Sequence, residues 1–228
     1  MAEAPHNVVL VAKALARLGL SDAVFVGGAT IPLRVTDAGA VPPRVTYDVD
    51  VVVDLRTRME FYRLEKRLRE AGYSQPVGGP ICRWTIDDVP VDLMPVDIGV
   101  LAFTTRWYGD LVRTAQSIRI APGLTIRVAD PGMLLVTKLE AYQDRGGGDF
   151  ALSHDITDVV TLLEGRPEIV AEVRRLGIDA KAFVRQVLSS LVSDEDFRFA
   201  IHGHLPPDAH SQERAEVVQQ RLRALLNE

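Results

Sequence analysis

Two aspartates in a short apolar segment have the types and spacing best suited to chemistry. Asp48 and Asp50 alternate with valines over 47–54, which reads YDVDVVVD. Because side chains two positions apart on a strand project from the same face, the spacing brings the two carboxylates together. Mg²⁺ prefers hard oxygen ligands and leaves positions for water and substrate phosphate. Asp48 and Asp50 are therefore candidate metal ligands, and the alternative is a strand whose polar face simply meets water.

A pair of glycines upstream is a candidate phosphate-binding turn. Gly27 and Gly28 follow the short β-rich run 23–26, and 29–35 has the pattern of a beginning helix. Backbone amides in such a turn can approach a phosphate closely, and a helix amino terminus favours its negative charge. We place Thr30 in the same turn. A tight turn without a ligand is the alternative explanation for the glycines.

A third carboxylate, that of Asp92, comes from the later apolar run 89–94, which reads VPVDLM. If this strand neighbours the first, Asp92 converges on the aspartate pair. A third carboxylate would complete a two-metal site and could help to deprotonate an attacking hydroxyl. A solvated strand position is the alternative. Asp87, Asp88 and Asp97 are better explained as turn residues.

One lysine shares the apolar face of a predicted helix. Lys138 lies four residues after Leu134 and four before Tyr142, which places the three side chains together. A lysine there either extends along the apolar surface to water or reaches into a cleft, where it could hold the β and γ phosphates. Asp155 and Asp158 share a face of the next helix, in whose first turn acidic residues also compensate the helix dipole.

The elements that must position these residues change in character along the chain. The patterns predict strands at 23–26, 47–53, 81–86, 89–93 and 124–128, and helices at 7–20 and 56–71. Helical patterns without a convincing strand follow at 131–143, 153–164, 166–176, 179–192, 194–202 and 208–227. This order predicts an α/β (α+β) domain with a mixed sheet over 1–129, and an α-helical domain over 130–228 that completes the active-site cleft.

These motifs together resemble a known superfamily. Gly27-Gly28, the run Arg44-x-Thr46-x-Asp48-x-Asp50 and Asp92 resemble the nucleotidyltransferase fold of the DNA polymerase β superfamily. The helical motif Lys138-Leu139-x-Ala141, then Arg145, then Asp155-x-x-Asp158, resembles the signature of the AbiEii/AbiGii-type toxin nucleotidyltransferases. The resemblance covers roughly residues 23 to 165. One departure is that Asp48 follows Gly28 by twenty positions, a longer connection than is usual in that family.

The resemblance implies transfer of a nucleoside monophosphate from an NTP to an acceptor hydroxyl, with Mg²⁺ held by Asp48, Asp50 and Asp92. It implies that Lys138 contacts the nucleotide phosphates, with Arg145 also binding the nucleotide, and that Asp155 rather than Asp158 completes the active site. The acceptor would be RNA, particularly tRNA, or a protein. Whether the protein has an antitoxin partner is left open by the sequence.

Two other functions remain as alternatives to this toxin-like enzyme. One is transfer to a small molecule, as antibiotic nucleotidyltransferases do. The other is a catalytically silent nucleotide-binding module that recognises a partner. The carboxylate pair and Lys138 argue against the silent module, because a scaffold gains nothing from clustered unpaired charges.

Composition excludes several other classes. The 26 basic residues against 31 acidic ones give a net charge of −5, which argues against a surface that coats duplex nucleic acid. The single cysteine, Cys82, forms no internal disulfide and fits a reducing cytosol. No apolar run approaches the roughly 18 residues of a membrane span, so we expect a cytoplasmic protein without membrane contact. His202, His204 and His210 lack the matching ligands of a metal site.

Overall fold

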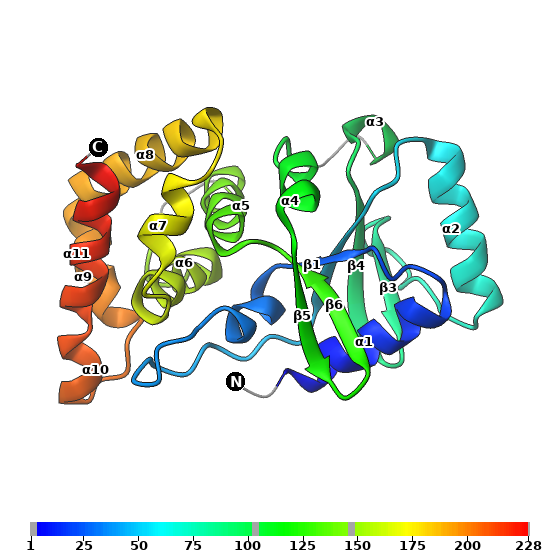
Figure 1. Cartoon of the computed structure of the whole chain (residues 1–228), viewed down its shortest axis with the longest axis horizontal. Coiled ribbons are helices and arrows are strands. Elements are labelled where there is room, and N and C mark those ends of the chain that lie inside the picture. The colour runs from blue at the N-terminus through cyan, green and yellow to red at the C-terminus, as the bar shows by residue number, and fades with distance from the viewer. Residues whose placement is uncertain (1–3, 102–104, 146–148, 228) are drawn as a thin grey trace. The chain divides into compact units, whose positions relative to one another are not determined.

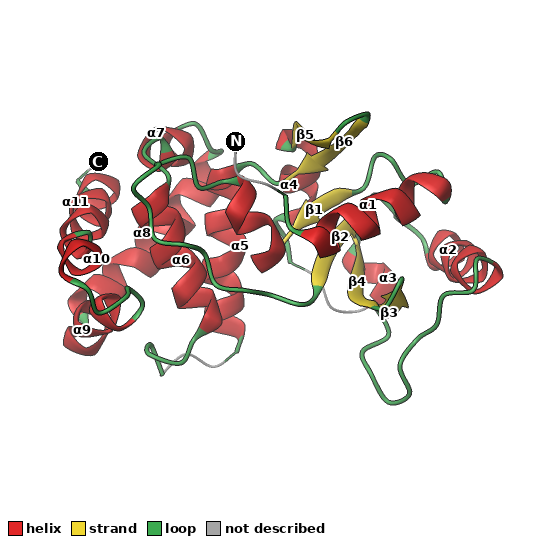
Figure 2. Cartoon of the chain, turned by 90° about the horizontal axis from the view of Figure 1, so that it is seen from below, coloured by secondary structure: helices red, strands yellow, loops and turns green. Residues whose placement is uncertain are grey.

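The computed structural model describes residues 4–101, 105–145 and 149–227 and divides into two compact units. One, here called the sheet unit, comprises the chain up to Pro32 and Val45–Asp130. The other, the helical unit, comprises Leu33–Arg44 and everything from Pro131 onward. Figure 1 follows the chain through both by colour, and Figure 2 separates strands from helices. The segment 33–44 therefore belongs with helices that follow it by about a hundred residues of chain.

The sheet unit is built on a six-stranded mixed sheet with strand order β3-β4-β2-β1-β6-β5. Its strands are β1 (Val24–Val26), β2 (Val49–Val53), β3 (Arg83–Ile86), β4 (Val89–Pro95), β5 (Gln116–Ala121) and β6 (Leu124–Val128). The pairs β2–β4 and β1–β6 are parallel, and the remaining neighbours are antiparallel. The predicted mixed sheet is confirmed.

The hairpin β3–β4 forms where the sequence predicts it. Asp87 and Asp88 have positive φ angles of 48° and 64°, as a two-residue type I′ turn requires. Strand β5 was not predicted. It lies at the edge of the sheet and pairs only with β6 among the named strands, and its side chains are mostly exposed or half-buried, so the apolar pattern that reveals a strand is weak.

Short and long helices surround this sheet. They are α1 (His6–Arg17), the 3₁₀ helix η1 (Gly28–Leu33), α2 (Arg58–Glu70), α3 (Ile98–Leu101) and α4 (Tyr108–Thr114). A capping box begins α2, in which Thr57 and Glu60 satisfy each other's backbone N–H groups. The Arg69 guanidinium of α2 lies 5.4 Å from the ring centre of Trp84, and the Tyr108 hydroxyl of α4 lies 2.9 Å from Met94 Sδ. Because Trp84 pairs with Val91 and strand faces alternate, α2 covers the face opposite to that of Asp92 and Met94.

The helical unit has no strand in its described residues. Its helices are α5 (Pro131–Asp144), α6 (His154–Gly165), α7 (Ile169–Arg174), α8 (Ile178–Ser193), α9 (Glu195–Gly203), α10 (Ala209–Glu213) and α11 (Ala215–Leu226). The single helix predicted over 208–227 is wrong, since the chain divides at Arg214 into α10 and α11. The guanidinium of Arg214 pairs with Asp37 and Glu164, a contact that local sequence does not reveal.

The segment 33–44 is anchored to the end of α6. The backbone N–H groups of Thr36 and Asp37 both donate to the Gly165 carbonyl, at 3.0 and 3.1 Å. A Cβ at position 165 would lie 2.9 Å from a methyl group of Val35, so glycine is what allows this close approach. Across the described parts of both units, no helix combines the length and apolar content that a bilayer crossing needs.

Candidate functional site

A row of directly paired residues crosses the centre of the sheet. Asp50 of β2 is the register partner of Asp92 in the parallel strand β4, and Arg83 of β3 is the register partner of Asp92 on its other side. Val26, at the end of β1, pairs with Asp50. Since paired residues of neighbouring strands share a face, the carboxylates of Asp50 and Asp92 lie side by side. Strands β2 and β4 are therefore neighbours, as the sequence analysis required if Asp92 was to lie near Asp50.

Asp48 lies just before this row. Strand β2 begins at Val49, so the predicted start of the strand at residue 47 is corrected, and Asp48 belongs to the entering loop. The Thr46 hydroxyl donates to Asp48 Oδ1 at 2.8 Å. The other oxygen of Asp48, Oδ2, lies 3.8 Å from Arg83 Nη2. With 45% of its side chain exposed, Asp48 is open to a ligand from solvent.

The first glycine of the predicted turn touches the carboxylate row. Gly27 has a φ of +71°, and a Cβ there would fall 1.8 Å from Asp50 Oδ2. Glycine therefore meets two needs at this position, a left-handed backbone and room for the carboxylate. Gly28 is buried at the start of η1. The turn thus packs its backbone directly against a candidate metal ligand.

Thr30 closes the same turn. It is buried, and both its backbone N–H and its hydroxyl donate to the Gly27 carbonyl, at 3.2 and 2.8 Å. The hydroxyl hydrogen is therefore used within the protein, which gives Thr30 a part in shaping the turn. The element that follows is a 3₁₀ helix of six residues instead of the expected longer helix, so its dipole contributes little to anion binding.

Arg83 is a functional candidate that the sequence interpretation missed. Its Nε donates to Asp92 Oδ1 at 2.8 Å and its Nη2 donates to Asp92 Oδ2 at 2.6 Å. These hydrogen bonds raise the pKa of Arg83 above its ordinary value. A signal for the pair was available, because a two-residue turn at 87–88 sets the hairpin register that places position 83 opposite position 92.

The buried thiol beside this pair is inert. Burial, and secondarily the carboxylate of Asp92, raise the pKa of Cys82 to about 11. The thiol therefore stays protonated at neutral pH and has little nucleophilic character.

In the helical unit, Lys138 is enclosed by carboxylates. Its Nζ lies 2.7 Å from Asp158 Oδ2 and 3.3 Å from Asp155 Oδ1. Only 10% of the lysine side chain is exposed, and the two aspartates expose 1% and 3%. The lysine therefore does not extend along the helix to water, and the two acids hold its ammonium group in place.

Two arginines complete this second group. Arg44 makes a bidentate pair with Asp158, from Nε to Oδ1 at 2.8 Å and from Nη2 to Oδ2 at 3.0 Å. Arg145 donates to Asp155, and 71% of the arginine side chain is exposed. The pairing of Arg44 was not predicted, because only the folding of 33–44 into the helical unit brings it to α6. Compensation of the α6 helix dipole is not the only role of Asp155 and Asp158, because each also pairs with cationic side chains.

The donor chemistry of the sheet unit fits Mg²⁺. Asp48 and Asp50 have the hard carboxylate oxygens that Mg²⁺ prefers, and Asp50 lies against Gly27. Mg²⁺ commonly binds through one or two carboxylates. Asp92 is different, because both of its oxygens already accept hydrogen bonds from Arg83. Within the described ranges, no three or more His, Cys, Asp or Glu side chains are grouped so that they could hold a metal ion.

The histidines near the carboxyl terminus have structural partners. His204 Nε2 lies 2.8 Å from the Phe150 carbonyl, and Nδ1 lies 3.1 Å from the Thr157 hydroxyl. Because the carbonyl can only accept, Nε2 carries the hydrogen. Burial lowers the pKa of His204 below its ordinary value, so the ring is neutral at pH 7 and fastens a loop to α6.

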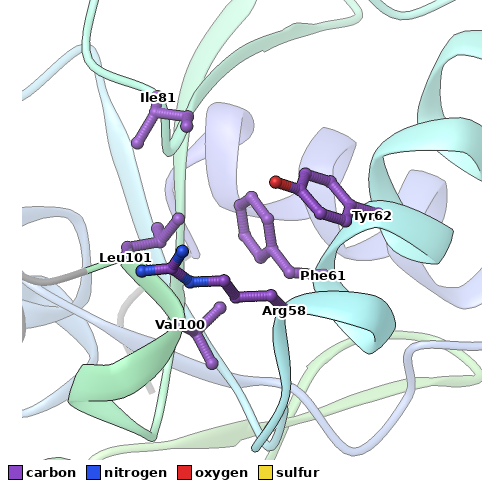
Figure 3. Close-up of a pocket in the computed structure, with 6 residues that line it drawn as sticks. All are labelled: Arg58, Phe61, Tyr62, Ile81, Val100 and Leu101. Carbon is purple, nitrogen blue, oxygen red and sulfur yellow. The ribbon is translucent and has the colours of Figure 1, made fainter.

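The sheet unit also contains an apolar pocket of about 230 Å³ (Figure 3). The described residues that line it are Arg58, Phe61, Tyr62, Ile81, Val100 and Leu101. Its walls include α2 and α3, which follow the carboxyl ends of β2 and β4. Asp50 lies near the other end of β2, at its beginning. None of those lining residues belongs to the carboxylate row.

Known proteins resemble the chain in fold. No protein-family model matches it, and no curated protein matches its sequence. An antigenic nucleotidyltransferase-like protein from Paracoccidioides brasiliensis is similar in structure, with a TM-score of 0.53 and 22% identity, over 86% of this chain and 91% of that one. The chain has a nucleotidyltransferase fold. JHP933 from Helicobacter pylori has a TM-score of 0.47 and 12% identity over 99% of this chain and 94% of that one.

Proposed function

We propose that this protein is a Mg²⁺-dependent nucleotidyltransferase that moves a nucleoside monophosphate from an NTP to an acceptor hydroxyl. The observation that carries the proposal is the row in which Asp50 and Asp92 lie side by side, with the Gly27 backbone against Asp50. The nucleotidyltransferase fold agrees with it. Bound Mg²⁺ would supply positive charge to the transferring phosphoryl group.

The residues of the sheet unit take the roles closest to the reaction. Asp48 and Asp50 hold the metal, and Asp92 acts as a further ligand or as the base that receives the proton of the acceptor hydroxyl. The acceptor oxygen forms its bond to the α-phosphorus while the bond to pyrophosphate breaks. Gly27 and Gly28 provide backbone amides for the phosphates, a role that their close packing on Asp50 supports for the first of them.

The residues of the helical unit bind the nucleotide in this proposal. Lys138 and Arg145 hold the triphosphate. Asp155 and Asp158 keep the lysine ammonium in a defined position, since both contact it within 3.3 Å. Asp158 thus joins Asp155 as an orienting acid, with its other partner, Arg44, fixing its carboxylate.

The acceptor we propose is RNA, particularly tRNA, or a protein hydroxyl, as a toxin-like enzyme in the cytoplasm would use. A net charge of −5 makes a broad, salt-sensitive grip on RNA unfavourable. An RNA acceptor would therefore be held by a local basic patch.

Label transfer tests the proposal directly. The protein is incubated with each α-labelled NTP and Mg²⁺, together with total tRNA, candidate proteins or small hydroxyl compounds. We expect label in RNA or protein, and at least a 100-fold lower rate in Asp50→Asn, on the order of what loss of one charge-stabilising group costs. Asp54→Asn is the matched control, because Asp54 follows the same strand but pairs with the exposed Arg56. Label only in small molecules would favour the antibiotic-type enzyme, and no transfer from any NTP would overturn the proposal.

A further inference from the structure

We propose that the apolar pocket of the sheet unit is a docking site for a partner protein, which inserts one apolar side chain into the pocket and places a carboxylate against Arg58 (Figure 3). The walls of the pocket come from α2, α3 and the segment before β3. None of its described lining residues belongs to the carboxylate row, so this interaction goes beyond nucleotidyl transfer and does not depend on it.

The size of the pocket suits a side chain of a protein. Its volume of about 230 Å³ is smaller than the roughly 300–1,000 Å³ of sites that enclose drug-sized ligands. Phe61 and Val100 line it and are almost completely buried. An apolar side chain inserted against them would lose its contact with water, as the anchor residues at the centres of protein interfaces do.

Exposed apolar side chains extend this surface beyond the pocket. Tyr62 and Ile81 line the pocket and remain 58% and 51% exposed. Met59 in the first turn of α2 and Ile98 at the start of α3 are also more than half exposed, and these two helices pack against each other. Exposed apolar side chains gathered in one region of a folded protein mark an interaction surface.

The aliphatic character of this surface favours a protein partner over RNA. Single-stranded RNA is bound largely by stacking of its bases on aromatic side chains. Of the four exposed apolar side chains, Tyr62 alone is aromatic, and the others are Met59, Ile81 and Ile98. Aliphatic walls are better matched by an apolar side chain than by the planar, polar-edged face of a base.

Arg58 places a positive charge at the pocket. Its Nε donates to the Gly99 carbonyl at 3.2 Å, and in Figure 3 its guanidinium extends from α2 toward Leu101. Over the residues that the structure describes, no carboxylate forms an ion pair with Arg58. The terminal nitrogens of the guanidinium can therefore bind an incoming carboxylate, to which arginine donates two parallel hydrogen bonds.

The acids on the same helix do not compensate this charge. Each has a different partner, in the capping box or in an ion pair along the helix, and they are Glu60, Glu65 and Glu70. The charge of Arg58 is thus complementary to an acid supplied from outside the chain. The partner segment we expect has a large apolar residue with Asp or Glu close to it.

Selection from a random peptide library displayed on phage tests this proposal. With the full-length protein as bait, the enriched peptides should share a large apolar residue next to Asp or Glu. Their affinity for Ile81→Asp, which puts a charge in the wall of the pocket, should be at least about tenfold lower, on the order of what the loss of one anchor contact costs. A second selection on Arg58→Glu should enrich Lys or Arg in place of the acid, because complementary charge decides which partner is accepted.

Two matched variants separate the pocket from its surroundings. Val77→Asp introduces the same charge in the same segment as Ile81→Asp, but Val77 is fully exposed and does not line the pocket. Arg63→Glu reverses a charge on α2 outside the pocket. Both should bind the selected peptides as the wild type does. Thermal unfolding of all four variants checks that each is folded, as the exposure of the substituted side chains leads us to expect.

Several outcomes would overturn the proposal. One is a peptide pool without a shared motif, and another is equal binding by the wild type, Ile81→Asp and Arg58→Glu. Binding of a labelled single-stranded RNA that is lost in Arg58→Glu, with no peptide enriched, would assign the pocket to RNA. A dimer detected by light scattering that dissociates in Ile81→Asp would assign it to a second copy of the chain. Label transfer is measured separately, so each of these results leaves the transferase proposal standing.

Discussion

The carboxylate row of the sheet unit and the charged group of the helical unit are built from the same residue types but balance their charges differently. In the sheet unit, Asp48, Asp50 and Asp92 lie with one arginine in their row, and Asp48 and Asp92 expose 45% and 15% of their side chains. In the helical unit, two aspartates that are almost completely buried meet a lysine and two arginines. We propose that the first group binds an added cation, whereas the two aspartates of the second group pair with three cationic side chains of the protein itself.

This difference predicts that substitutions in the two groups affect stability to different extents. A buried charge that loses its partner is left without water to stabilise it, which costs about 3–5 kcal/mol, whereas exposed pairs contribute about 0–1 kcal/mol. The helical group should therefore govern the stability of its unit. The carboxylate row should govern the response to divalent cations.

The largest effect on stability is expected for Asp158→Asn. The substitution leaves Lys138 and Arg44 without their shared carboxylate and should lower the free energy of unfolding by about 3–5 kcal/mol. Urea denaturation followed by circular dichroism measures this change. As a control, Glu195→Gln removes one partner of an exposed pair with Arg198 and should change stability by no more than about 0.5 kcal/mol. Equal losses in the two variants would show that burial does not distinguish these pairs.

The next largest effect concerns divalent cations. Mg²⁺ at 100 times its Kd should stabilise the wild type by about 2.7 kcal/mol, because the ion binds the folded state. Chelation should reverse this gain, and Asp50→Asn should abolish it. Asp155→Asn should lower the basal stability but keep the Mg²⁺ increment. Thermal unfolding with and without Mg²⁺ measures the basal stability and the gain in stability from Mg²⁺. A gain that is lost in Asp155→Asn but kept in Asp50→Asn would contradict this prediction and place the Mg²⁺ site in the helical unit.

A smaller effect is expected from Gly27→Ala. The new methyl group would overlap Asp50 Oδ2 in a backbone with positive φ, so it must displace the carboxylate. Gly19→Ala is matched for backbone strain, with a φ of +65°, but its Cβ would approach only Arg67 Nη2, at 3.6 Å. We expect Gly27→Ala to be less stable than Gly19→Ala by about 1 kcal/mol and to bind Mg²⁺ more weakly. Indistinguishable Mg²⁺ affinities by isothermal titration calorimetry would contradict this.

The smallest effect extends the comparison to a half-buried histidine, His204, whose ring nitrogens contact a backbone carbonyl and a hydroxyl. Burial lowers the pKa of His204 below the ordinary 6.5, so the unfolded chain binds a proton more readily than the folded protein does. The contribution of this group to stability is therefore complete above pH 6.5 and declines as the pH falls below it. His204→Gln should flatten the decline between pH 7 and 5, whereas the exposed His210→Gln should not. A slope equal to the wild-type slope in His204→Gln, measured by urea denaturation, would argue against this cause.

Much of the fold could be predicted because the signals are local. The valine run of β2, the Asp87–Asp88 turn and the proline at the start of α5 each determine their element through a few neighbouring residues. Strand β5 escaped prediction because an exposed edge strand lacks an apolar pattern. The break at Arg214 also escaped prediction, and the side chain at that position pairs with Asp37 and Glu164, which are remote in sequence.

The candidate site was only partly predictable for a related reason. The chemistry of Asp48, Asp50 and Asp92 is visible in the residue types. Alternation along the predicted strand led us to expect that the first two share a side, but β2 begins only at Val49 and Asp48 lies in the loop before it. That Asp92 joins them depends on β4 pairing with β2 in register. A shift of one residue would have turned it to the opposite face.

The sequence by itself determined which groups this protein can use: paired carboxylates, a glycine turn, a lysine on an apolar helix face and acids at the start of α6. These follow from side-chain chemistry and from the periods of strand and helix. Only the tertiary structure decided which cation meets which carboxylate. Arg83 reaches Asp92 across a hairpin, and Arg44 reaches Asp158 across 114 residues of chain. Such pairings depend on strand order and on the packing of 33–44 in the helical unit, which are properties of the folded chain as a whole.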